Sequence, residues 1–163
     1  GLLMIEQPLE HDDLMDHAQL QSKLSTAICL DESITGIKRA KQALALGSCR
    51  IINIKIGRVG GYSQALGIHD LCYDQGIPVW CGGMLESGIG RAHNIALASL
   101  PGFSLPGDIS ASSRYFARDL IVPEVTVSAD GTVIAPLGPG LGFSVDLEYI
   151  IEKTETLMRL EPH

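Results

Sequence analysis

Short apolar runs alternate along the chain with longer segments in which apolar residues recur at helical spacing. Isoleucines at positions 52, 54 and 56 alternate with Asn53 and Lys55, the period of two that a pleated strand requires. Comparable runs predict strands at 2–6, 26–30, 50–56, 78–81 and 103–105. Helices are expected between them at 12–24, 37–46, 63–74 and 91–100. This alternation favours parallel strands joined by helical crossovers.

The polar residues that end the first three strands are evenly spaced. Glu6, Asp31 and Lys55 recur at intervals of about 25 residues, and such a period is typical of a (β/α) barrel. We therefore predict an α/β fold in which residues 1–120 form about five βα units of a TIM-type barrel. Residues 121–163 break the pattern, with a hairpin expected at 124–134, a loop rich in glycine and proline, and a helix at 144–160.

The length of the chain bears on its completeness. A whole (β/α) barrel needs about 250 residues, and this chain has 163. A partial barrel leaves open strand edges whose backbone groups need cover. We therefore expect the chain to be the C-terminal part of a larger protein, or to pair with another copy of itself.

Composition and charge exclude several other classes of protein. The net charge is −7, which disfavours a nucleic acid or an anionic membrane as the partner. No apolar run approaches the ~20 residues that span a bilayer, and no signal peptide is visible. The four cysteines lack metal-ligand spacing, so we expect reduced, buried thiols and a cytoplasmic protein.

Three polar side chains are expected to converge at one end of the sheet. The pleat places Glu6, Asp31 and Lys55 in the same phase, at the C-terminal ends of neighbouring strands. Converging carboxylates and an amine are costly to bury unless a cation or a substrate charge joins them. Oxygen ligands without histidine or thiolate suit a hard cation, above all Mg²⁺, with Mn²⁺ as an alternative. A salt-bridge cluster of the two carboxylates with Lys55 is the competing interpretation.

Several stretches of the chain resemble the enolase superfamily. They are 5–8 (IEQP), 30–33 (LDES), 53–61 (NIKIGRVGG), 82–92 (GGMLESGIGRA), 105–116 (LPGDISASSRYF) and 139–142 (PGLG). The likeness is to the muconate-lactonizing subgroup, and within it to the o-succinylbenzoate synthases and the N-succinylamino acid (N-acylamino acid) racemases. Each motif is weak alone, but together they are specific in order and spacing, and they cover nearly the whole chain.

The resemblance implies roles for individual residues. Glu6 and Asp31 are similar to the second and third carboxylate ligands of the family's Mg²⁺, and Lys55 to the acid/base lysine on the sixth barrel strand. By the same likeness, residues 1–120 are barrel strands four to eight, and residues 121–163 are associated with a capping domain. The first metal-ligand aspartate and an opposing pair of lysines belong to earlier strands that this sequence does not contain. We therefore expect the chain alone to be inactive.

The chemistry implied by the resemblance is removal of the proton α to a carboxylate, with Mg²⁺ stabilising the enediolate. Two reactions are implied: the dehydration by o-succinylbenzoate synthase, a lyase of menaquinone biosynthesis, and the racemisation of N-succinylamino acids. In the first, Lys55 would hold the charged intermediate by a cation–π contact; in the second it would be one of two bases. The expected partners are a small carboxylate substrate and further copies of the protein in a homo-oligomer.

Four further residues are candidate substrate contacts: Asn53, Arg58, Gly83 and Leu85. Asn53 either orients the lysine or a ligand, or packs in a polar layer of the barrel. Arg58 either reaches a substrate carboxylate or pairs with an acidic residue on the surface. Gly83 and Leu85 are expected to shape the pocket wall.

Other functions stay open on the sequence. A dipeptide epimerase and a muconate cycloisomerase share the fold and the metal that the resemblance implies. Residues 105–110 lack the paired acidic residues that epimerases commonly place on the last strand, which disfavours the first of these. A non-catalytic barrel fragment is a further alternative.

Overall fold

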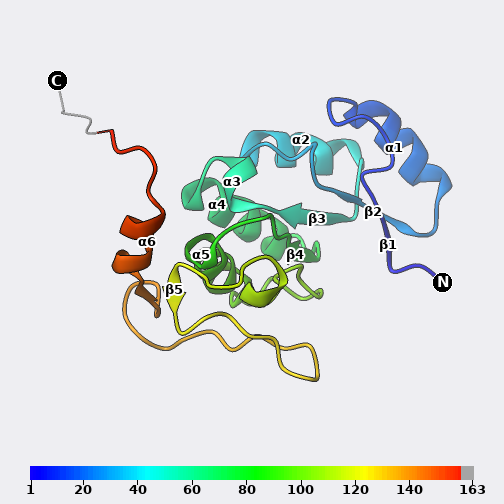
Figure 1. Ribbon diagram of the computed structural model, residues 1–163. Coiled ribbons are helices and arrows are strands. Elements are labelled where there is room, and N and C mark those ends of the chain that lie inside the picture. The colour runs from blue at the N-terminus through cyan, green and yellow to red at the C-terminus, as the bar shows by residue number, and fades with distance from the viewer. Residues whose placement is uncertain (159–163) are drawn as a thin grey trace. The chain divides into compact units, whose positions relative to one another are not determined.

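A four-stranded parallel sheet forms the centre of the first of two compact units (Figure 1). The computed structural model describes residues 1–158, and the first unit contains residues 1–84 and 94–109. Its strands are β1 (Met4–Glu6), β2 (Ala27–Leu30), β3 (Ile51–Ile54) and β4 (Val79–Cys81). They pair in chain order, and every pair is parallel. The expected α/β class is confirmed.

Helices connect the strands, as the hydrophobic periodicity predicts. They are α1 (Leu14–Lys23), α2 (Ile37–Leu46), a short α3 (Ile56–Val59), α4 (Tyr62–Asp74) and α5 (Gly88–Ala98). Asp13 caps α1, since its side chain accepts a hydrogen bond from the backbone N–H of Asp16 at 2.8 Å. Gly47 follows α2 in the left-handed conformation (φ 72°) that favours glycine after the end of a helix.

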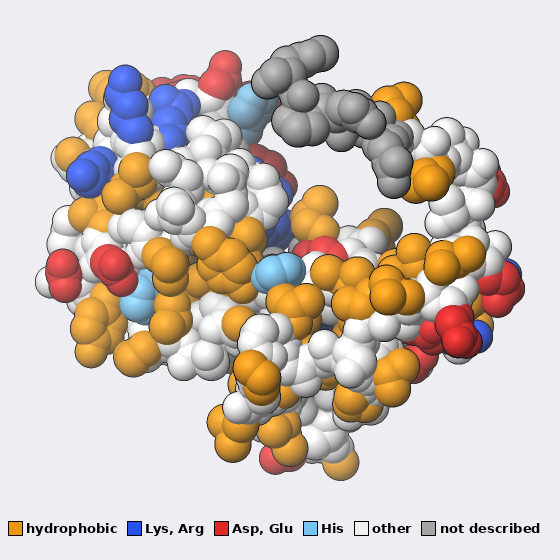
Figure 2. All heavy atoms as spheres, turned by 90° about the vertical axis from the view of Figure 1, so that its left-hand side faces the viewer, with side chains coloured by type: hydrophobic (Ala, Val, Ile, Leu, Met, Phe, Trp, Pro, Cys, Tyr) orange, Lys and Arg blue, Asp and Glu red, His pale blue; other side chains and the backbone are white. Residues whose placement is uncertain are grey.

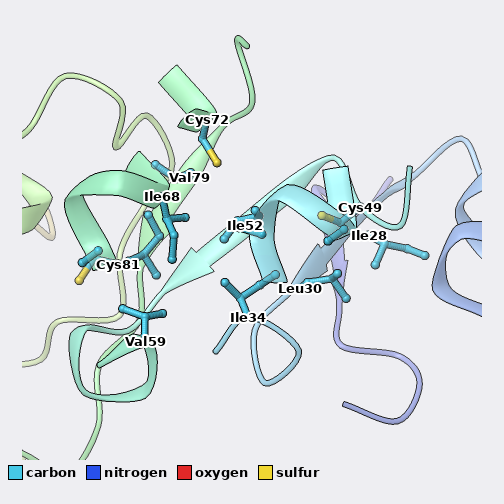
Figure 3. Close-up of a cluster of buried hydrophobic side chains, with 14 of the residues drawn as sticks. Ile28, Leu30, Ile34, Cys49, Ile52, Val59, Ile68, Cys72, Val79 and Cys81 are labelled. Carbon is cyan, nitrogen blue, oxygen red and sulfur yellow. The ribbon is translucent and has the colours of Figure 1, made fainter. Parts of the chain in front are cut away.

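The hydrophobic core of this unit lies between the sheet and its helices (Figure 3). Alternate residues of β2 and β3 supply it: Ile28, Leu30, Ile52 and Ile54 are fully buried. Buried residues of α2 and α4 pack in the same cluster. Because this core takes up the aliphatic phase of each strand, the other phase carries the polar residues to the opposite face. All four cysteines are free and buried, as expected.

Every strand of the first unit is shorter than predicted, and the changes at 50–56 and 103–105 affect the connections around the site. β3 ends one residue before Lys55, which is the N-cap of α3, so the chain turns into a helix where the strand was expected to continue. Gly60 follows α3 in the left-handed region (φ 89°), which favours glycine. The strand expected at 103–105 is reduced to a single parallel bridge between Phe103 and Val79.

The second unit contains residues 85–93 and those from 110 onward. Its elements are a 3₁₀ turn η1 (Ser112–Arg114), the antiparallel pair β5 (Ile121–Val122) and β6 (Ser144–Val145), and α6 (Leu147–Lys153). A buried ion pair joins Arg91 Nη1 to Asp119 Oδ2 at 3.4 Å. Burial alone would raise the pKa of Asp119, but hydrogen bonds from Ser112, Gly88 and Leu120, with the charge of Arg91, lower it.

The hairpin expected at 124–134 is present only as its turn. The backbone N–H of Ser128 donates to the carbonyl of Thr132 at 2.9 Å, but no strand is assigned to these residues. The carbonyl of Val125 instead accepts from the N–H of Ser112 at 2.9 Å, so a partner outside the run takes its hydrogen bond. The helix expected at 144–160 is shorter: it begins later because Asp146 caps α6, and it ends at Lys153. Positions 159 and 160 lie outside the described residues.

Apolar side chains are exposed in this second unit, Ile134 (86%) and Ile151 (74%) among them. Figure 2 shows hydrophobic side chains spread over one face of the molecule. No helix in the described part of the chain is both long enough and apolar enough to span a bilayer.

Candidate active site

The polar phase of the strands brings three predicted site residues together at the C-terminal end of the sheet. Glu6 ends β1, Asp31 follows β2 and Lys55 follows β3. They line one cavity of about 470 Å³, whose other lining residues are Gln7, Glu32, Trp80 and Asp108. The convergence that the pleat predicts is therefore present in the first unit.

Asp31 is the buried charge at the centre of this group. Its side chain is 4% exposed, and its Oδ2 lies 2.9 Å from Lys55 Nζ. Its Oδ1 contacts Nη1 of Arg58, whose side chain is 20% exposed. Burial lowers the pKa of the Arg58 guanidinium, and the Glu6 carboxylate opposes that effect. Two cationic groups thus compensate one buried carboxylate, as a buried charge requires.

Arg58 therefore pairs with a buried acidic residue of the site and not with one on the surface. The ion pair between Lys55 and Asp31 is the one that the salt-bridge interpretation predicts. Glu6 does not take part in this ion pair. Its carboxylate has a different partner, because Glu6 Oε1 accepts a hydrogen bond from Asn53 Nδ2 at 3.1 Å.

Asn53 reaches Glu6 across the intervening strand β2. The two residues can meet because both side chains point to the same face of the sheet, although β2 lies between their strands. Asn53 Oδ1 is buried and has no hydrogen-bond partner among residues 1–158. Asn53 therefore orients a carboxylate of the cavity, and it leaves one buried oxygen available as an acceptor or ligand.

Gly82 is a site residue that the sequence analysis missed. A Cβ at this position would lie 2.5 Å from Asn53 Oδ1 and would also meet Lys55 Cε. Only glycine leaves room for both side chains. The signal in the sequence is the Gly82-Gly83 pair directly after β4, of which only the second residue was predicted to shape the pocket wall.

Gly83 and Leu85 are placed differently. A Cβ at Gly83 would collide with the backbone carbonyl of Asp108, so the glycine allows two backbone segments to approach each other. Leu85 is 75% exposed and belongs to the second unit. A substrate contact for either residue stays a prediction.

Trp80 and Gln7 were also missed. Trp80 pairs in register with Asn53, and its Nε1 donates to Cys29 Sγ at 3.2 Å. The alternation along β4, with Val79 and Cys81 in the core, would have placed Trp80 on the side of the cavity. Gln7 stands beside Glu6 in the chain, but only the structure shows what its side chain contacts.

The donor set of this cavity fits a hard divalent cation. Glu6 and Asp31 supply carboxylate oxygens, and the Asn53 amide oxygen is unpaired among the described residues. Mg²⁺ is commonly held by one or two carboxylates while it keeps several waters. Residues 1–158 contain no group of three His, Cys, Asp or Glu that could hold a metal ion. Of the acidic residues that line the cavity, Glu6 and Asp31 would be the predicted ligands of such an ion, and the rest of the coordination would come from water, substrate or other residues.

A parallel α/β sheet with acidic and basic side chains at its C-terminal strand ends is the architecture of a (β/α)-barrel enzyme. Residues 1–150 match the enolase C-terminal domain-like family, so the chain belongs to this family.

Relatives of known structure or function agree with this assignment. The chain is 60% identical to an o-succinylbenzoate synthase of Geobacillus kaustophilus over 95% of its own length. It is 53% identical to an N-succinylamino acid racemase of Amycolatopsis sp. over 94% of its length. A solved enolase-superfamily structure from Listeria innocua superposes with a TM-score of 0.91 at 50% identity, covering 95% of this chain and 42% of that one. The chain spans 41% of the length of each of these two curated relatives.

Proposed function

We propose that the full-length protein containing this chain removes the proton α to a carboxylate of a small substrate, as an o-succinylbenzoate synthase, an N-succinylamino acid racemase, or both. The observation that carries the proposal is the position of Lys55 Nζ, 2.9 Å from Asp31 Oδ2 and in the same cavity as Glu6. A titratable amine beside two carboxylates at strand ends suits proton transfer. The identities of 60% to a synthase and 53% to a racemase support the two reactions.

Glu6 and Asp31 would hold Mg²⁺, or Mn²⁺ in its place. The bound cation supplies positive charge that stabilises negative charge developing on the substrate carboxylate. Asn53 Nδ2 restrains the Glu6 carboxylate through the 3.1 Å hydrogen bond. A restrained ligand loses less rotamer freedom on binding, so Asn53 favours occupancy of the site.

The neutral amine of Lys55 takes a proton from the substrate α-carbon and becomes an ammonium, and in the reverse direction the ammonium returns the proton. Its Nζ must leave Asp31 to do so, and Arg58 makes this possible. Because Arg58 Nη1 contacts the other carboxylate oxygen, Asp31 keeps a cationic partner when the amine moves. In racemisation Lys55 serves one face of the α-carbon; in dehydration its ammonium holds the charged intermediate by a cation–π contact.

The test is exchange of the α-proton with solvent. The full-length protein is incubated in D₂O with an N-succinylamino acid, and the α-proton signal is followed by NMR with Mg²⁺ and after chelation. Exchange with racemisation is expected in the presence of Mg²⁺ and is expected to stop after chelation. Dehydration is followed in parallel with the hydroxy acid that yields o-succinylbenzoate. Absence of both reactions in the metal-loaded protein would refute the proposal.

A further inference from the structure

Gln7 joins the two segments that carry the carboxylates of the site. It directly follows Glu6, and its Oε1 accepts hydrogen bonds from the backbone N–H groups of Asp31 at 3.0 Å and Ser33 at 3.2 Å. Its Nε2 donates to Ser33 Oγ at 2.8 Å and to the carbonyl of Leu9 at 3.3 Å. A side-chain amide has two acceptor lone pairs and two donor hydrogens, so the amide of Gln7 is fully used.

The backbone of Gln7 is held in an uncommon conformation. Its φ of 38° lies in the left-handed region, and it is the one non-glycine residue with positive φ among residues 1–158. Its N–H still continues the parallel ladder, donating to the carbonyl of Cys29 at 2.8 Å. A disfavoured backbone of this kind persists where surrounding contacts hold it, and such positions cluster at functional sites.

These hydrogen bonds determine where the chain leaves β2. The last ladder pair of that strand with β1 joins Cys29 to Glu6, so the N–H of Asp31, which lies on the β1 side of β2, needs a partner outside the ladder. The Gln7 amide is that partner, and the N–H of Ile34 closes the turn onto the carbonyl of Asp31 at 2.9 Å. Gln7 thereby ties the buried Asp31 to its own neighbour in sequence, Glu6.

We infer that Gln7 is a positioning residue that holds Glu6 and Asp31 at the spacing needed to bind one divalent cation. The inference rests on the proposed function, since it concerns the cation of that site. Removing a residue that orients metal ligands typically weakens metal binding by 10- to 100-fold. Gln7→Met keeps the length of the side chain and removes the amide, so it should raise the dissociation constant for the cation by about 10- to 100-fold.

The chain contains a matched control at the other end of the same strand. Gln21 Oε1 accepts from the backbone N–H of Ile28 at 2.7 Å, and its Nε2 donates to the carbonyls of Leu24 and Thr26 at 3.3 and 3.2 Å. Gln21 is buried and braces the start of β2 as Gln7 braces its end. Gln21→Met therefore removes a similar set of bonds without touching the cavity.

The experiment measures binding of Mn²⁺ alone to the full-length protein and its variants, from the paramagnetic resonance of free Mn²⁺. Amide hydrogen exchange supplies a second readout. Gln7→Met should weaken Mn²⁺ binding 10- to 100-fold and speed exchange at Asp31 and Ser33. Gln21→Met should leave the Mn²⁺ dissociation constant within about twofold of wild type and speed exchange at Ile28 instead, because distant sites act independently.

Three results would overturn the inference. They are an unchanged dissociation constant in folded Gln7→Met, an equal weakening in Gln21→Met, and a wild-type protein that binds no Mn²⁺. If Gln7→Met does not fold, Ser33→Ala takes its place, because it removes only one of the two acceptors of Gln7 Nε2. Ser33→Ala should raise the dissociation constant for Mn²⁺ above the wild-type value, by less than about 100-fold. An unchanged dissociation constant overturns the inference. Mn²⁺ binding without turnover would refute the proposed reaction and leave this test valid.

Discussion

Replacement of Lys55 separates proton transfer from the ion pair with Asp31. Lys55→Arg keeps a positive charge that can reach the Asp31 carboxylate, but a guanidinium is not deprotonated in proteins. Lys55→Met removes both the charge and the proton carrier while keeping a long, flexible side chain. The two variants should therefore differ in stability and agree in lost activity.

The structure sets the stability cost. Lys55→Met loses one charge-assisted hydrogen bond of 2.9 Å between side chains that are 15% and 4% exposed. Hydrogen bonds to charged groups contribute about 1.5–3 kcal/mol to the free energy of unfolding. Arg58 remains on the other oxygen of Asp31, so the loss in the free energy of unfolding should be ~1.5 kcal/mol. Lys55→Arg should lose less, because the charge pair is kept.

The catalytic cost should be larger than the cost in stability. A positioned acid or base contributes about 10²- to 10⁴-fold in rate, which is ~2.7–5.5 kcal/mol of activation free energy. Racemisation needs proton transfer on both faces of the α-carbon. Both variants should therefore lose at least about 100-fold in racemisation, whichever enantiomer is supplied.

The assay follows the circular dichroism of an N-succinylamino acid, starting from each enantiomer in turn, with full-length protein loaded with Mg²⁺. Denaturant unfolding of the same samples gives the free energy of unfolding. α-Proton exchange in D₂O shows which enantiomer presents its proton to Lys55. Racemisation by Lys55→Arg at more than about one tenth of the wild-type rate would contradict the role of Lys55 as an acid/base.

Two further predictions concern space and pH. Gly82→Ala places a methyl group 2.5 Å from Asn53 Oδ1. The folded variant should lose about 10-fold or more in kcat, because small displacements of site groups slow catalysis strongly. A wild-type kcat would contradict this prediction. Burial raises the pKa of the buried thiols to about 12 in Cys29, Cys49 and Cys72. The folded state therefore retains protons that the unfolded chain releases above about pH 8.5, so the free energy of unfolding should fall with rising pH, by up to ~1.4 kcal/mol per pH unit per thiol. Unfolding at pH 8 to 10 measures this slope, and an unchanged slope in Cys72→Ala would refute it.

The local pattern of the sequence was enough to predict the layers of the first unit. The period of two in 50–56 shows which side of the strand is apolar, and the same phase in β1 and β2 places Glu6, Asp31 and Lys55 on one face. The predicted bounds of α2 match the structure, because helical periodicity and the glycine that ends the helix are local features of the sequence. The motifs also sufficed for the family, which residues 1–150 match.

The prediction failed where tertiary contacts compete with local pattern. The alternating run at 124–134 predicts two strands, yet the carbonyl of Val125 accepts a hydrogen bond from the N–H of Ser112 and its N–H donates to Ser112 Oγ, outside the run. Lys55 reads as a strand residue, but it caps a helix. Hydrophobic periodicity describes which side of a segment is buried, and it does not identify the partner that takes the backbone hydrogen bonds.

What the sequence determined by itself is therefore that three charged residues at strand ends, Glu6, Asp31 and Lys55, face one cavity. Only the tertiary structure decided how they pair: Asp31 with both Lys55 and Arg58, Glu6 with Asn53, and Gln7 with the turn after β2. The physical reason is that side-chain phase is a property of one strand, whereas a contact between strands depends on how they are aligned along the sheet. That alignment arises from the packing of the whole core.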